Sequence, residues 1–183
     1  MRKLKITELN RLTTKEFKAS EKHNVVVVLD NVRSLNNVGS VFRTADAFKL
    51  KSVLLCGITA TPPHNEIHKT ALGAEDSMSW QYFEKTEEAV IHLKSEGYTI
   101  VAIEQVDKSI LLTDFKPNKT NRYALIFGNE VKGVQQKVID LCDFSLEIPQ
   151  FGTKHSLNVS VSAGIVIWEV IKQLIVNNQP YLD

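Results

Sequence analysis

The sequence lacks any uninterrupted apolar stretch of the roughly 20 residues that a membrane-spanning helix needs. Its start, MRKLKITELNRLTTKEF, also lacks the apolar core of a secretion signal. The only two cysteines, Cys56 and Cys142, stand alone in apolar runs, with no partner at a metal-ligand or redox spacing. We therefore expect no membrane partner, no metal site and a cytoplasmic location, with both cysteines as buried free thiols.

Glycine-rich phosphate loops are absent as well. The 8 glycines form neither G-x-G-x-x-G nor a P-loop after the first expected strand, which disfavours a Rossmann-type dehydrogenase or methyltransferase. HNEIH at 64–68 does not match the zinc-protease pattern H-E-x-x-H. SVSAG at 160–164 lies inside a helical pattern rather than at the strand-to-helix turn of a serine hydrolase. Neither segment predicts a catalytic site.

Net charge is also small, +1 for the whole chain, whereas nucleic-acid-binding domains are often strongly basic. The charge is unevenly distributed. Residues 1–22 hold seven basic and three acidic residues, so this arm carries +4 and the remainder −3. A basic arm can dock a phosphate backbone, and the alternative is a solvated helix face.

Patterns of strand and helix alternate along the 183 residues. Short, strongly apolar runs predict strands at 25–30, 52–56, 98–103, 123–127 and 145–148. Helical spacing predicts helices at 37–48, 86–96 (with a Thr86 cap), 135–141 and 156–176. The alternation predicts an α/β fold with a mostly parallel sheet between helices, as one domain at 25–176 with a basic extension at 1–24 and a tail at 177–183. The longest stretch expected to be irregular is 59–80.

Polar residues collect after the first, fourth and fifth expected strands, where ligands of such sheets bind. Arg43 lies about two turns into the helix after the first strand, and its fork of donors suits a phosphate or carboxylate, with a surface salt bridge as the alternative. The turn at 128–130 has little side-chain bulk, so it either lets a ligand approach the main chain or merely opens a helix. Ser156 is the expected N-cap of the last helix, and Asn158 follows close to the sheet edge.

Three ordered segments resemble the motifs of the SpoU (TrmH) family of RNA ribose methyltransferases. LDNVRSLNNVGSVFRTADAF resembles the first motif, LIFGNEVKGV the second and IPQFGTKHSLNVSVSAGIVIWE the third, and KTALGAEDSMSW is similar to the stretch between them. The resemblance runs from about residue 25 to about residue 175. It implies a SPOUT fold, an α/β sheet whose C-terminal part is threaded into a deep trefoil knot, a feature that composition and periodicity do not reveal.

The resemblance also implies an activity, a cofactor and partners. The activity is S-adenosylmethionine-dependent methylation of a ribose 2′-hydroxyl in tRNA or rRNA, with a slight lean to tRNA because the separate N-terminal RNA-binding domain of many members is missing. The assembly implied is a homodimer with sites formed across its interface. The catalytic residues that the motifs imply are Asn37, Arg43, Glu130, Ser156 and Asn158. The expected cofactor-binding residues are Glu104, Gly128, Asn129, Ile148, Pro149 and Leu157.

Arg43 matches the arginine proposed in the family to activate the ribose hydroxyl. Arginine is too weak an acid to serve as a base in water, so we interpret Arg43 as an anchor and polariser, and a role as base needs a phosphate relay or an unusual setting. The alternative function is a catalytically silent RNA-binding or assembly protein on the same fold, and cofactor binding separates the two.

The last expected helix carries more apolar positions than one sheet face needs, which predicts the dimer interface. The positions concerned are Leu157, Val161, Ile165 and Trp168, along with Val159, Val166 and Ile167.

Overall fold

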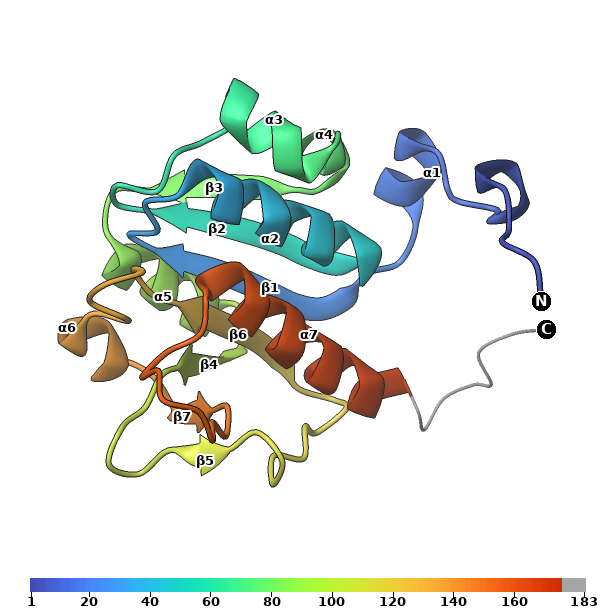
Figure 1. Ribbon diagram of the computed structural model, residues 1–183. Coiled ribbons are helices and arrows are strands. Elements are labelled where there is room, and N and C mark those ends of the chain that lie inside the picture. The colour runs from blue at the N-terminus through green and yellow to red at the C-terminus, as the bar shows by residue number, and fades with distance from the viewer. Residues whose placement is uncertain (176–183) are drawn as a thin grey trace.

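The computed structural model describes residues 1–175 and shows a seven-stranded sheet with helices on both faces (Figure 1). Every pair of neighbouring strands is parallel, and the spatial order is β3-β2-β1-β6-β4-β7-β5. The strands are β1 (His23–Asp30), β2 (Leu50–Cys56), β3 (Trp80–Phe83), β4 (Tyr98–Ile103), β5 (Ile110–Leu111), β6 (Arg122–Phe127) and β7 (Phe144–Glu147). The predicted α/β class and parallel sheet are confirmed.

The helices form two layers around this sheet. They are η1 (Ile6–Glu8), α1 (Thr14–Ala19), α2 (Leu35–Ala47), α3 (Asn65–Ala71), α4 (Ala74–Ser77), α5 (Thr86–Ser95), α6 (Gln136–Ile139) and α7 (Val159–Ile175). Helices α2 and α7 cover one face, and α5 and α6 pack against the other (Figure 1). All four predicted helices are confirmed in kind, with ends that differ by a few residues. Residue 176 and the predicted tail 177–183 lie outside the described residues.

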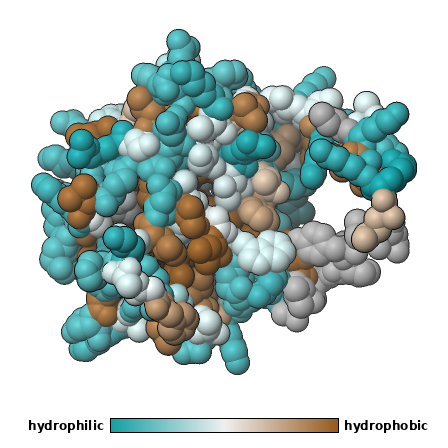
Figure 2. All heavy atoms as spheres, viewed as in Figure 1, coloured by the Kyte–Doolittle hydropathy of each residue, from teal (hydrophilic) through white to brown (hydrophobic). Residues whose placement is uncertain are grey.

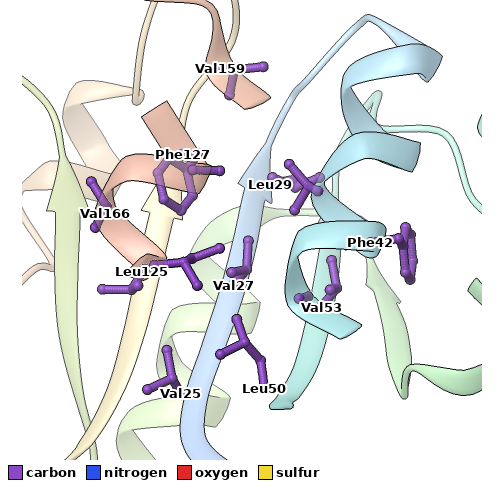
Figure 3. Close-up of a cluster of buried hydrophobic side chains, with 14 of the residues drawn as sticks. Val25, Val27, Leu29, Phe42, Leu50, Val53, Leu125, Phe127, Val159 and Val166 are labelled. Atoms are coloured by element: carbon purple, nitrogen blue, oxygen red, sulfur yellow. The ribbon is translucent and has the colours of Figure 1, made fainter. Parts of the chain in front are cut away.

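Strand β1 shows why the sheet is buried on both faces. Val25, Val27 and Leu29 join the core under α2 and α7, which Figure 3 shows with their neighbours on β2 and β6. The alternate residues Val26 and Val28 belong to the second core, under α5. Because successive side chains of a strand point to opposite faces, a strand covered on both faces must be apolar throughout, as the run VVVVL is.

The sequence predicts that the segment 59–80 is irregular, and this prediction is wrong. The segment folds into α3 and α4 before β3 begins. Helix α3 packs so closely on α2 that a Cβ at Gly39 would lie 2.2 Å from the Ile67 carbonyl oxygen. Gly39, the glycine of the first motif, is therefore required by helix packing. The short helices escaped prediction because seven and four residues are too few to show a helical period.

Two predicted helix caps are wrong. Lys85, not Thr86, is the N-cap of α5, and the Thr86 hydroxyl donates to Asp30 instead. Asn158, not Ser156, caps α7, since its Oδ1 accepts from the amides of Ser160 and Val161 at 2.9 and 3.3 Å. The Thr86 side chain thus serves another purpose, and Ser156 stands two residues before the cap.

The basic arm begins with η1 and α1 and lies at the amino ends of the strands (Figure 1). Thr13 and Glu16 form a reciprocal capping box that starts α1, and Phe17 is buried in the core under α2. The arm is therefore anchored at its C-terminal half. Among residues 1–175, no helix is both long and apolar enough to cross a bilayer.

Candidate functional site

The carboxyl ends of the central strands surround a cavity of about 650 Å³. Its walls come from the ends of β4, β6 and β7, from the loop 128–134 and from the start of α7. The residues predicted for the site that line it are Glu104, Gly128, Asn129, Glu130, Ile148, Ser156, Leu157 and Asn158. Residues of the second and third motifs, together with Glu104, thus meet at the sheet edge where ligands of parallel sheets bind.

Glu130 ties the loop after β6 to the loop after β1. The amides of Arg33 and Ser34 donate to its carboxylate, each at 2.9 Å. The Asn37 side-chain amide adds a third hydrogen bond, at 3.0 Å. Burial raises the pKa of Glu130, but these donors outweigh it and leave the pKa below its usual value. The carboxylate therefore serves as a brace between two motifs.

Asp30, at the end of β1, is a second brace and is completely buried. Its oxygens accept from the main-chain and side-chain amides of Gln135, at 2.9 and 2.7 Å. Thr86 Oγ1 donates at 2.6 Å from the start of α5, and Asn31 Nδ2 donates at 2.8 Å. Burying a carboxylate is costly unless its oxygens are hydrogen-bonded, and these four donors meet that need.

Glu104 holds the same loop from the opposite side. Its Oε2 accepts from the amide of Val134 at 2.9 Å, next to the Gln135 amide that Asp30 binds. Gly133 has a φ of 64°, and a Cβ there would lie 2.1 Å from Glu104 Oε2, so glycine is required at this turn. Two carboxylates thus fix consecutive amides and set the shape of the loop wall.

Asn37 and Asn158 join the first motif to the third. Asn158 Nδ2 donates to Asn37 Oδ1 at 3.1 Å, across 121 positions of sequence. Because Asn37 also donates to Glu130, the three predicted catalytic residues form one hydrogen-bonded chain that links α2, the 128–135 loop and α7. Asn37 itself is buried behind the cavity wall and does not line it.

Arg43 and Pro149, also predicted for the site, are not among the residues that line the cavity of one chain. Arg43 lies on the exposed side of α2 and forms no hydrogen bond or ion pair with any residue in 1–175. The structure therefore brings together nine of the predicted residues, counting Asn37 in the brace, and leaves Arg43 facing outward.

The outer face of α7 is apolar and exposed. Figure 2 shows hydrophobic side chains gathered near the middle of this view, over α7. The exposed residues of this stripe are Leu157, Val161, Ile165 and Trp168, with exposed fractions of 38 to 50%. Val159, Val166 and Ile167 are buried in the core instead, so the prediction of an interface narrows to the four exposed positions.

Sequence reasoning missed several residues of the site. Gln150 and His155 line the cavity, and their only sequence signal was their place between the two ends of the third motif. Asp30 carried a clearer signal, because it is a charged residue that closes the apolar run VVVVL. Nothing in the sequence pointed to Gln135 as its partner, 105 positions away.

Two histidines and the cysteines have local roles. His64 caps α3, and His68 Nδ1 lies 2.5 Å from Glu75 Oε1. Both cysteines are free, as predicted, with Cys56 buried and Cys142 half-buried. Burial raises the pKa of the Cys56 thiol to about 12 and that of Cys142 to about 11, which makes both poor nucleophiles.

The chain matches the model of the SpoU rRNA Methylase family over residues 24–168. It is 30% identical over 160 residues to the 23S rRNA (guanosine-2′-O-)-methyltransferase RlmB of Neisseria meningitidis, covering 85% of this chain and 61% of the relative. It is 29% identical to a putative TrmH family tRNA/rRNA methyltransferase of Staphylococcus saprophyticus, with the same two coverages. The chain thus spans about three fifths of the length of these relatives.

Solved structures agree with this match. The A. aeolicus TrmH/SpoU tRNA modifying enzyme superposes with a TM-score of 0.76 at 23% identity, covering 87% of this chain and 81% of that one. The AdoMet-bound rRNA methyltransferase of Sinorhizobium meliloti superposes with a TM-score of 0.77 at 25% identity, covering 87% and 60%. The fold is the one that the motifs imply, and the deep trefoil knot is implied by that fold. With the family model spanning all three motifs and the sheet that joins them, the chain belongs to the SpoU rRNA methylase family.

Proposed function

We propose that the protein is an S-adenosylmethionine-dependent methyltransferase that acts on a ribose 2′-hydroxyl of RNA. The observation that carries this proposal is the cavity at the carboxyl ends of β4, β6 and β7, on which the second and third motifs converge. The names of the relatives support the reaction, since one is a guanosine-2′-O-methyltransferase of 23S rRNA and one solved neighbour binds AdoMet. A tRNA substrate remains our slight preference from the sequence, and rRNA is the competing substrate.

The residues of the cavity fit a nucleoside cofactor. Its volume of about 650 Å³ lies within the usual range for small-molecule sites. Apolar walls suit an adenine ring: Ile103, Phe127, Val134, Leu146, Ile148, Leu157 and Val159. Polar groups suit the ribose and the amino acid end: Glu104, Gln150, Ser156, Asn158 and Ser162. When bound, the cofactor supplies an electrophilic methyl group.

The residues of this chain have three tasks in the reaction. The braced loop 128–135 and the segment 148–158 hold the cofactor through main-chain groups and a few polar side chains. Asn37, Glu130 and Asn158 keep the first motif in register with that loop. The ribose hydroxyl must be lined up with the methyl group and must lose its proton, and positioning alone can contribute several kcal/mol of the barrier. Arg43 is our candidate for anchoring and polarising the RNA.

Arg43 does not line the cavity of its own chain, and a homodimer through α7 accounts for how it acts at a cavity. Arg43 and the apolar stripe lie on the outer surfaces of α2 and α7, two helices that pack side by side on one face of the sheet (Figure 1). We propose that two copies associate through this surface and that Arg43 acts at the partner's cavity. Sedimentation at micromolar concentration tests the dimer, and a single 20.6 kDa species contradicts it.

Cofactor binding is the first test of the function. Calorimetry should show S-adenosylmethionine binding to the protein, and Ser162→Leu, which puts apolar bulk into the cavity wall, should weaken it at least about 10-fold. The matched control is Ser95→Leu at the exposed end of α5, which should bind normally. No binding by the unaltered protein favours the alternative, a silent RNA-binding or assembly protein.

The second test identifies the product. Mapping of 2′-O-methyl positions in tRNA and rRNA from cells with and without the gene should reveal a nucleotide whose ribose is methylated only when the gene is present. Loss of a base methylation instead contradicts the ribose assignment. The RNA class that carries the change decides between tRNA and rRNA.

A further inference from the structure

A second cavity, of about 620 Å³, lies at the opposite end of the sheet from the first. It is formed where β1, β2 and β4 begin and where α1 and α5 end. We call it the amino-end groove. Its charged and polar residues are Lys18, Ser20, Glu21, Lys22, Asn24, Lys51, Ser52, Ser77, Ser79, Gln81, His92 and Glu96.

The strands change character where they enter this groove. Under α5 the sheet face is apolar, with Val26 on β1 and Leu54 on β2. Toward the amino ends the same face carries Asn24 and Ser52, two residues before each of these, and Gln81 on β3 pairs with Leu54. A sheet face that a helix covers is apolar, whereas this part is polar and leaves Asn24 and Gln81 exposed. The groove is thus built to face water or a polar ligand.

Lysines give the groove an excess of positive charge. Lys18, Lys22 and Lys51 line it, and the pKa of Lys22 is lowered by burial and by the nearby charges of Lys49 and Lys51. Lys18 and Lys51 are exposed and form no ion pair with residues 1–175.

The carboxylates that face this cluster balance only part of it. Glu96 lies 3.6 Å from His92, Asp46 accepts from Ser77 Oγ at 2.5 Å, and Glu21 is exposed.

Two of the three carboxylates of the arm that borders the groove are used within the arm, and the third, Glu21, is exposed. Glu8 accepts two hydrogen bonds from the Arg2 guanidinium, at 2.9 and 2.6 Å. Glu16 closes the capping box with Thr13. The remaining cations of the arm form no ion pair with any residue in 1–175: Lys3, Lys5, Arg11, Lys15, Lys18 and Lys22.

We propose that the amino-end groove, together with the arm, binds the sugar-phosphate backbone of the RNA substrate away from the catalytic cavity. The proposal rests on the proposed function for the identity of its ligand. Amide and hydroxyl side chains flanked by lysines are the groups that contact phosphates and ribose hydroxyls. Tyr98 of the groove and Ile103 of the first cavity lie five positions apart on β4, about 17 Å at about 3.3 Å per residue, so an RNA strand is long enough to contact both.

The test compares two double variants of equal charge. Lys18→Gln with Lys51→Gln removes two cations of the groove, and Lys116→Gln with Lys119→Gln removes two exposed lysines that line neither cavity. Binding of a fluorescent tRNA and of a fluorescent rRNA fragment is measured by anisotropy over a salt series. The groove variant should bind RNA about 5- to 10-fold more weakly, with a salt slope smaller by about 1, and the control should be within about 2-fold of the unaltered protein.

Catalysis and a charge-retaining variant sharpen the result. The groove variant should raise the KM for RNA and leave kcat and the S-adenosylmethionine Kd unchanged, because the contact is remote from the reacting atoms. Lys18→Arg with Lys51→Arg should bind RNA normally. Equal losses in groove and control variants, or an unchanged salt slope, overturn the proposal. If no RNA is methylated even by the unaltered protein, the proposed function fails, and a selective loss of RNA binding in the groove variant still supports the groove.

Discussion

The two ends of the sheet use charge in opposite ways. At the carboxyl ends, the carboxylates of Asp30, Glu104 and Glu130 accept hydrogen bonds from loop amides and shape a pocket. At the amino ends, Lys18 and Lys51 line an open groove and form no ion pair with residues 1–175. A net charge of +1 conceals this division. The hydrogen-bonded carboxylates determine the shape of the cavity, whereas the exposed lysines are available to bind a partner.

The largest expected effect tests whether the cavity at the carboxyl ends of the strands contains every group that the reaction needs. The carboxylates of Asp30, Glu104 and Glu130 hold loop amides, and we propose that Arg43 of the partner copy anchors and polarises the RNA there. Arg43→Ala should lower methyl transfer on the order of 100-fold or more, and S-adenosylmethionine affinity should stay within about three-fold. Arg43→Lys should fail too, because an ammonium lacks the planar fork that grips phosphate and hydroxyl together.

A substrate with 2′-deoxyribose at the target position is the chemical control for Arg43. This substrate should bind to the unaltered enzyme but accept no methyl group, since the 2′-hydroxyl is the proposed nucleophile. Near-normal turnover by Arg43→Ala, or methylation of the deoxy substrate, contradicts the mechanism.

The next effect tests the braces themselves. Asp30→Ala leaves the donors of Gln135, Thr86 and Asn31 without an acceptor in a buried position, and we expect it to lower the free energy of unfolding by about 3 to 5 kcal/mol. Thr86→Val removes only one of these bonds and should cost about 1 kcal/mol. Urea unfolding measures both. Losses of equal size would mean that Asp30 does not organise the loop.

The arm offers a smaller effect at the amino end. Deleting residues 1–22 would also remove Phe17 from the core, so the informative deletion is 1–12, which keeps the Thr13 cap. This deletion should weaken RNA binding a few-fold and reduce the salt slope by up to about 2, because it removes a charge of about +3. Anisotropy over a salt series measures the slope. An unchanged slope would mean that the arm does not contact RNA and is only a solvated segment.

The smallest effect concerns pH at the carboxyl end. The pKa of Glu130 is lower in the folded protein than in the unfolded chain, so its braces stabilise the fold above the unfolded pKa and lose this contribution as pH falls through the folded pKa. Glu130→Gln should therefore be less stable than the unaltered protein near pH 7, with the difference shrinking as pH falls through the folded pKa of Glu130. Thermal melts across pH measure it. Glu88→Gln, at an exposed position on α5, should show no such trend.

Central elements of the fold could be predicted from the sequence, and marginal ones could not. The run VVVVL at β1 is apolar because both faces are buried, and such a run carries its own signal. The edge strands β3 and β5 have mostly exposed side chains and two to four residues, so neither length nor pattern marks them. The short helices α3 and α4 are fixed by packing on α2 and by chain connections, which no local window contains.

The site could be predicted as a set of motifs but not as an arrangement. Gly128, Leu157 and Asn158 could be predicted because they belong to segments that resemble the sequence motifs of the family. All three line the cavity. The Asp30 to Gln135 brace joins positions that share no local pattern, so it required the structure. The placement of Arg43 on an outer face equally depends on how α2 packs, and its catalytic role stays a prediction.

The order of the strands also determines when the sheet can be completed during synthesis of the chain. Strand β1 pairs with β2 soon after it emerges, but its other edge pairs with β6, which begins at Arg122. At about 5 to 20 residues per second, a ribosome needs roughly 5 to 20 s to supply that partner. Throughout this interval β1, with its apolar run VVVVL, presents an open edge that can pair with another nascent chain. Every copy of the protein therefore passes through a vulnerable state set by topology rather than by stability.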